Sequence, residues 1–101
     1  MARKTVNISS NEIYEQLNLQ LTNGWEANSD SEIDTLCING RDFNLGYIVQ
    51  LVMDSYKGYS FIVYEFVERK EDGETNESDN DFLTYDEALN FIRTKVEAYS
   101  A

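Results

Sequence analysis

The sequence predicts an α+β domain in which two helices pack on one face of a three-stranded antiparallel sheet, in the order α-β-β-β-α. Near each end of the chain, apolar residues recur every three or four positions, as they do in amphipathic helices. Between these segments lie runs rich in Tyr, Val, Ile and Phe, separated by short turns that contain glycine, which is typical of antiparallel strands. Because 42 % of the 101 residues are apolar, we expect one core and a single domain over residues 1–101.

The first helix is expected over residues 10–22. Ser9 and Glu12 form a capping box at its start, and apolar residues then follow at every fourth position. Asn23-Gly24 is a suitable end, because glycine adopts the left-handed conformation found after helices. Residues 1–8 are expected to form a flexible arm before this helix.

Three strands are expected, over residues 33–38, 46–54 and 59–68. Asn39-Gly40, after the first of them, favours a type I′ hairpin turn, in which both central residues need positive φ. The two longer strands carry apolar residues on both faces. Two helices on one side can cover only one of these faces, so the other face is expected to bind something else or to form an exposed aromatic patch.

An acidic loop is expected over residues 69–82, since this stretch is rich in carboxylates and holds few apolar side chains. The second helix is expected to start at a capping box formed by Thr84 and Glu87. Its apolar stripe then runs to Tyr99.

The predicted element order resembles that of the double-stranded-RNA-binding domain over residues 9–99. That family carries a lysine cluster at the start of its second helix, where this chain has Asp86 and Glu87. The resemblance therefore implies the element order and does not imply RNA binding.

The composition excludes most catalytic chemistry. There is no His, so imidazole bases, Ser-His pairs and histidine metal ligands are absent. The lone Cys37 has no partner for an internal disulfide, the glycines form no phosphate-binding loop, and the acidic residues lack the spacing of a calcium-binding EF-hand. We therefore expect no enzyme activity, no catalytic residue, no cofactor and no metal. A hydrolase that uses only carboxylates stays open as an alternative.

The formal net charge is -11, and the excess acidic residues fall in two blocks, over residues 23–46 and 71–101. Nucleic acid and anionic membranes would repel such a chain, so the expected partner is a basic protein, with no direct contact to nucleic acid or membrane. No run of about 18 apolar residues and no secretory signal is present, which predicts a cytoplasmic protein. Candidate partner-binding residues are three acidic residues of the first block, the carboxylates of residues 71–81, and two tyrosines at the turn between the two longer strands: Asp30, Glu32, Asp34, Glu71, Asp72, Glu74, Glu77, Asp79, Asp81, Tyr56 and Tyr59.

In size, charge and lack of catalytic residues the chain resembles the small acidic inhibitors encoded by phages and mobile elements, including anti-CRISPR and anti-restriction proteins. This resemblance implies a DNA mimic, acting in the host cytoplasm, whose carboxylates imitate phosphates and block the basic groove of a nuclease or other DNA-binding protein. Three alternatives stay open. The chain could be a toxin-neutralising immunity protein, a structural or assembly module that binds through its aromatic sheet face, or a protein whose charge serves solubility alone.

Overall fold

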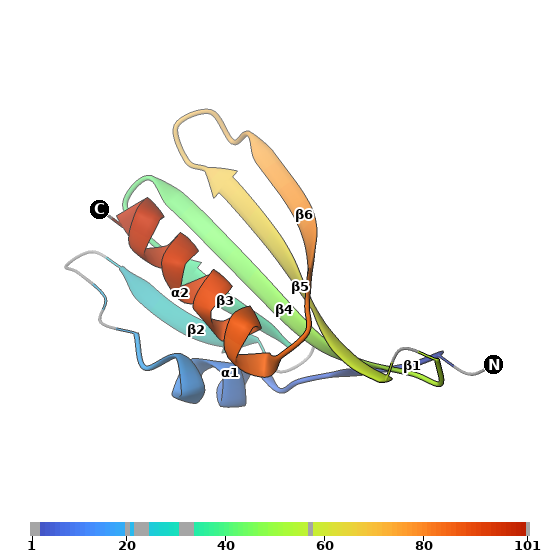
Figure 1. Ribbon diagram of the computed structural model, residues 1–101. Coiled ribbons are helices and arrows are strands. Elements are labelled where there is room, and N and C mark those ends of the chain that lie inside the picture. The colour runs from blue at the N-terminus through green and yellow to red at the C-terminus, as the bar shows by residue number, and fades with distance from the viewer. Residues whose placement is uncertain (1–2, 20, 22–24, 31–33, 57, 101) are drawn as a thin grey trace.

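The computed structural model describes residues 3–19, 21, 25–30, 34–56 and 58–100, which form two helices and six strands (Figure 1). In chain order the elements are β1 (Arg3–Asn7), α1 (Ser10–Leu17), β2 (Glu26–Asp30), β3 (Thr35–Asn39), β4 (Phe43–Asp54), β5 (Gly58–Arg69), β6 (Thr75–Phe82) and α2 (Tyr85–Ser100).

All strands belong to one antiparallel sheet with the order β2-β3-β4-β5-β6. Strand β1 pairs with the second half of β4, beyond the part that pairs with β3. The prediction of an α+β protein with an antiparallel sheet is confirmed. The predicted three-stranded sheet and the order α-β-β-β-α are wrong, and with them the resemblance in element order to the double-stranded-RNA-binding domain.

Two of the additional strands, β1 and β2, are short and polar. Residues 3–7, expected in a flexible arm, pair with β4, and the exposed Val6 lies opposite Leu51. Residues 26–30, which lie between the expected first helix and the expected first strand, pair with β3 at the edge of the sheet. Backbone hydrogen bonds to a neighbouring strand hold such segments in place. The side-chain pattern therefore carries little sign of them.

The third additional strand, β6, replaces most of the expected acidic loop. Residues 75–82 pair with β5 along their whole length, which leaves only a short turn after Arg69, with Gly73 at φ 71°. Charged side chains on an edge strand oppose pairing with a second copy of the same strand. A strongly acidic segment is thus compatible with a strand position at the edge of a sheet, and the prediction of a loop over these residues is wrong.

Both helices differ in part from expectation. Helix α1 ends at Leu17, because Asn18 adopts the left-handed conformation at φ 48°. The expected stop at Asn23-Gly24 lies outside the described residues. The predicted capping box at Ser9 is wrong, since its side chain makes no cap hydrogen bond. The predicted cap of α2 at Thr84 is confirmed in part: the Thr84 hydroxyl accepts a hydrogen bond from the Glu87 backbone N–H at 3.1 Å. The Glu87 carboxylate accepts from this hydroxyl at 3.0 Å, whereas in a full capping box it accepts from the backbone N–H of the capping residue.

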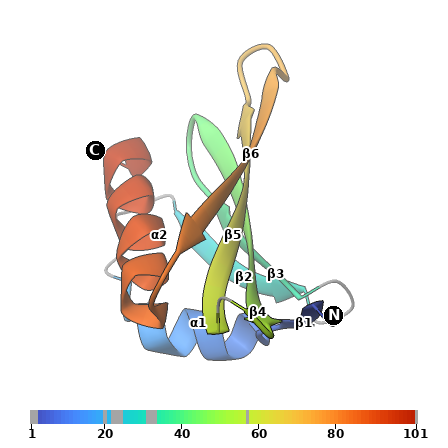
Figure 2. The ribbon, with the colours of Figure 1, turned by 45° about the vertical axis from the view of Figure 1, so that its right-hand side comes forward.

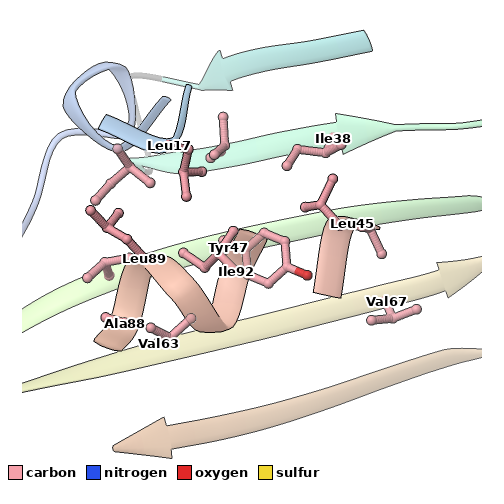
Figure 3. Close-up of a cluster of buried hydrophobic side chains, with 13 residues drawn as sticks. Leu17, Ile38, Leu45, Tyr47, Val63, Val67, Ala88, Leu89 and Ile92 are labelled. Atoms are coloured by element: carbon pink, nitrogen blue, oxygen red, sulfur yellow. The ribbon is translucent and has the colours of Figure 1, made fainter. Parts of the chain in front are cut away.

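Both helices contribute to one hydrophobic core on the same side of the sheet (Figures 2 and 3). Leu17 comes from α1 and Ile92 from α2, and both side chains are completely buried. Side chains at alternate positions of β4, such as Tyr47 and Val49, face the helices and are 1 % exposed. Ile48 between them belongs to the opposite face of the sheet, so the predicted alternation is confirmed in this strand.

The turn between β3 and β4 differs from the predicted type I′ turn. Neither Asn39 nor Gly40 has positive φ, and the turn spans residues 40–42, closed by a hydrogen bond from the Gly40 N–H to the Phe43 carbonyl at 2.9 Å. The indole of Trp25 lies directly over Gly40, in the space that a Cβ atom would occupy. Glycine is therefore required here for close packing and not for a special backbone conformation.

Tyr85, the first residue of α2, packs against Phe61 with the two rings tilted by 37° and their centroids 5.6 Å apart. Its hydroxyl is buried without a hydrogen-bond partner among the described residues. Burial raises the pKa of this phenol, and the charge of Glu12 raises it further. A buried hydroxyl without a partner loses its hydration without compensation. We expect Tyr85→Phe to raise the free energy of unfolding by about 1 kcal/mol in urea titrations. Tyr14→Phe is the control, because Tyr14 is 46 % exposed; a loss of stability in Tyr85→Phe would contradict the expectation.

Candidate protein-binding surface

The side of the sheet opposite the helices carries an apolar strip along its inner strands. We call this side the open face, because both described helices pack on the other side (Figure 2). Its centre combines residues of β3, β4 and β5 that the strand register brings together: Cys37, Gly46, Ile48, Tyr64 and Phe66. The Phe66 side chain is 38 % exposed, although it is one of the largest apolar groups of the strand.

A hollow of about 490 Å³ lies at the centre of the open face, lined by this strip and by the neighbouring acidic side chains. Gly46 forms part of its lining. A Cβ atom at Gly46 would lie 3.5 Å from the Thr35 methyl carbon and 3.6 Å from the Phe66 Cβ, which are ordinary contact distances. The missing side chain at this position therefore contributes to the depth of the hollow, and the methyl group of an alanine would fit there and reduce it.

Three carboxylates of β6 border this strip. Glu77 lies opposite Phe66, Asp79 opposite Tyr64, and Asp81 one pair further along β5. Directly opposed residues of an antiparallel pair project to the same face of a sheet, so these side chains belong to the open face. They are exposed, and among the described residues they form no salt bridge. We call Glu77, Asp79 and Asp81 the acidic row; its members are about 6.7 Å apart along the strand.

The opposite border of the open face is strand β2. Glu26 opens this strand opposite Asn39, and it is exposed. Asp30 closes the same strand, while its side chain and the whole of Glu32 lie outside the described residues. Asp34 is half-buried in the turn before β3, with φ 50°. The structure thus places Glu26, which was not a predicted site residue, at this border.

Two acidic residues of the β5–β6 turn differ from the acidic row, because they form salt bridges. Arg69 pairs with Asp72 at 3.0 Å and with Glu74 at 2.6 Å. The Glu74 backbone N–H and the Arg69 guanidinium hold the pKa of Asp72 below its usual range, and the Asp72 hydrogen bond contributes most to raising the pKa of Arg69. Asp72 and Glu74 therefore already have a cationic partner. Glu71 is exposed and forms no salt bridge within the described part of the chain.

The predicted site tyrosines lie apart from the acidic row. Tyr56 is 86 % exposed in the turn that joins β4 and β5, at the end of the sheet that extends beyond the helices (Figure 1). Tyr59 lies opposite Met53, at an odd-numbered position that belongs to the helix side of the sheet, and is 68 % exposed. The structure does not bring these two side chains together with the carboxylates of β6.

Hydrogen bonds stiffen the open face at both ends of the hollow. At one end the Tyr64 hydroxyl donates to the Gln50 side chain at 3.1 Å, and Gln50 donates to the Asn7 side chain at 2.8 Å. At the other end the Asn44 amide donates to the Glu68 carboxylate at 2.8 Å. A surface whose side chains are already ordered loses less conformational entropy when it binds a partner.

The signal that sequence reasoning missed is the spacing of the acidic row. Acidic residues at positions 77, 79 and 81 alternate with Ser78 and Asn80, and a period of two is the spacing of residues on one face of a strand. Within the described residues, no group of three or more potential ligands is close enough to hold a metal ion, and no helix is long and apolar enough to cross a membrane. The chain matches no protein-family model, no curated protein and no solved structure.

Proposed function

We propose that this protein binds a basic, nucleic-acid-binding protein through the open face and inhibits it by occupying the surface where that partner holds nucleic acid. The observation that carries this proposal is the acidic row, which lies beside the uncovered apolar strip. Its carboxylates follow one another in a line, as phosphates do along a nucleic-acid strand. The Lys and Arg side chains with which a protein binds phosphates can also form ion pairs with these carboxylates.

Long-range electrostatics support the same proposal. The net charge of -11 attracts a basic partner protein and repels nucleic acid. It therefore speeds association with the partner protein and does not speed association with the nucleic acid that the partner binds. Because the acidic row forms no salt bridge within the described residues, its charge remains available to a partner. An exposed row of this kind predicts association that slows markedly as salt is added.

The apolar strip supplies the short-range part. Complementary charge contributes more to the association rate and to specificity than to affinity, and most of the binding energy of protein interfaces comes from a few buried anchors. Phe66 and Ile48 beside the hollow are suitable contacts for such an anchor. The same hollow favours a second candidate function, an assembly module that binds another protein without displacing nucleic acid. Salt separates the two functions, because an apolar interface responds little to ionic strength.

The test measures DNA cleavage by a panel of purified nucleases with basic DNA grooves, titrated with this protein at low and at high salt. We expect inhibition of at least one nuclease at low salt, relieved by salt and by excess DNA. In the variant Glu77→Gln/Asp79→Asn/Asp81→Asn, the concentration that gives half inhibition should rise about tenfold or more, because three charge pairs with the partner are lost.

The matched control removes the same charge from the two helices, with Glu12→Gln/Glu15→Gln/Glu97→Gln, and should inhibit as the wild type does. An equal loss in both triple variants would show that net charge, and not the acidic row, acts. Absence of inhibition across the panel would contradict the proposal. Binding that persists at high salt and leaves DNA bound would favour the assembly module.

A further inference from the structure

We infer that the part of the partner that docks on the open face is an amphipathic α-helix with a basic flank. This inference rests on the proposed function and specifies the chemistry of the partner segment. It follows from four features of the open face: its backbone pairing, its width, the spacing of the acidic row and the hollow at Gly46.

The backbone pairing favours a helix over an extended segment. Strands β3, β4 and β5 are inner strands, paired on both sides over the region of the hollow. Their N–H and C=O groups are used within the sheet, so the open face offers side chains only. An extended segment lying on this apolar strip would bury backbone groups without partners, whereas a helix satisfies them internally.

The width of the strip fits one helix. From β3 to β5 the sheet spans two strand spacings, about 10 Å. A helix with its side chains measures about 10–12 Å across. An apolar stripe of a docked helix would therefore cover the strip, and its flanks would lie over β6 on one side and towards β2 on the other. The sheet already accepts a helix on its other side, where α2 packs over β4 and β5.

The spacing of the acidic row fits basic residues on a helix. Members of the acidic row are about 6.7 Å apart along β6. Residues four positions apart on a helix are separated by about 6 Å along its axis. Lys or Arg at positions i, i+4 and i+8 of a helix that lies along β6 would each face one carboxylate of Glu77, Asp79 and Asp81. Flexible basic side chains can absorb the small difference in spacing.

The hollow supplies the anchor point. Gly46 and Phe66 line it, and Thr35 lies within contact distance of a Cβ atom placed at Gly46. An apolar side chain from the middle of the helix stripe would enter here and be removed from water. Filling the hollow from within the protein should therefore compete with the docked helix.

The probe is a synthetic peptide of about 18 residues, which is long enough to form a marginally stable helix in water. It carries leucines along one stripe of the helix, lysines at i, i+4 and i+8 on one flank, and Ala and Gln at the other positions. A second peptide has the same composition in an order that destroys the stripe. Fluorescence anisotropy at low salt measures both affinities. We expect the ordered peptide to bind at least about tenfold more tightly and to gain helical circular dichroism on binding, since only its order aligns apolar anchors with basic residues.

Variants of the protein locate the binding site. Gly46→Val should weaken binding of the ordered peptide about tenfold, as expected for loss of an anchor contact, and Gly46→Ala should weaken it less. Tyr14→Ser, on helix α1 at the other side of the sheet, is the matched control and should leave the affinity unchanged, because Tyr14 is exposed and does not line the hollow. Circular dichroism of each variant checks that the sheet is intact, and Gly46→Ala serves if Gly46→Val fails to fold.

The outcomes separate this inference from the proposed function. If the two peptides bind equally well, or if neither binds, the inference that a helix docks on the open face is overturned. The nuclease assay still tests the proposed function in that case. Tight binding that Gly46→Ala and Gly46→Val both leave unchanged overturns docking on the open face. Tight, helical binding that weakens in these variants supports the inference, even where the nuclease assay fails and only the inhibitory role is lost.

Discussion

Tyr47→Phe is expected to lower the free energy of unfolding by about 2–3 kcal/mol, because it leaves a buried carboxylate without its hydrogen-bond donor. The Tyr47 hydroxyl donates to Glu65 at 2.8 Å, and the side chain of Glu65 is one of the few charged groups in the interior, 8 % exposed. Among the described residues, the only other side chain that donates a hydrogen bond to this carboxylate is Ser78, whose hydroxyl lies at the long distance of 3.5 Å. Urea unfolding at pH 7 measures the loss.

The matched control is Tyr64→Phe. Tyr64 lies on the same strand as Glu65, but its hydroxyl donates to the uncharged, partly buried Gln50 side chain. Its removal should cost about 1 kcal/mol or less. Combining Tyr47→Phe with Glu65→Leu should recover part of the loss, because no buried acceptor then remains. Equal losses in the two single variants would contradict the role assigned to Glu65.

The same pair predicts a response to alkaline pH. Burial of the phenol, and next the negative charge of Glu65, raise the pKa of Tyr47 far above its ordinary value. The folded state therefore keeps this proton, while the unfolded state releases it above about pH 10. Stability from this group is complete below that pH and falls above it by about 1.4 kcal/mol per pH unit. Urea titrations at pH 9, 10 and 11 should show this extra slope in the wild type and not in Tyr47→Phe.

Gly40→Ala is expected to destabilise the protein by about 1–3 kcal/mol, the usual cost of forcing extra volume into a packed site. The added methyl group would coincide with the Trp25 indole, so the ring or the turn must move. This turn is also held by Lys70, the residue after β5: its ammonium group donates to the Gly40 carbonyl at 2.6 Å, and its backbone N–H donates to the Asp42 carbonyl at 2.9 Å. The indole is therefore the group expected to give way, and Trp fluorescence should report its displacement.

A double-mutant cycle tests this explanation. Trp25→Ala removes the indole ring and by itself lowers the free energy of unfolding. Adding Gly40→Ala to this variant should lower the free energy of unfolding by little more. Gly46→Ala is the matched control and should not lower the free energy of unfolding. A Cβ atom at Gly46 would meet its neighbours only at ordinary contact distances, and glycine in the interior of a strand is unfavourable. If Gly40→Ala costs as much without the indole as with it, the close packing of Trp25 is not the cause.

The helices and the two central strands could be predicted because their side chains carry the signal themselves. The stripe around Ile92 and the alternation around Tyr47 record burial against one core, and the hydrogen-bonding side chain of Thr84 marks the start of α2. By contrast, the residues of β1, β2 and β6 are mostly polar, and their place in the sheet depends on backbone pairing with a neighbour. Backbone groups are the same in every residue, so composition cannot reveal which segments pair.

The candidate site divides in the same way. The acidic side chains were found from composition alone, and so was the presence of apolar residues on both faces of the central strands. The positions of these side chains relative to one another could not be predicted, because the strand register sets them. Glu77 lies beside Phe66 on the open face, whereas Asp72 pairs with Arg69. Tyr59 lies on the helix side of the sheet. Register depends on long-range pairing between strands. The charge and the core-forming segments follow from the amino-acid sequence, whereas the pairing of strands in the folded chain sets which carboxylates share a face with the apolar strip.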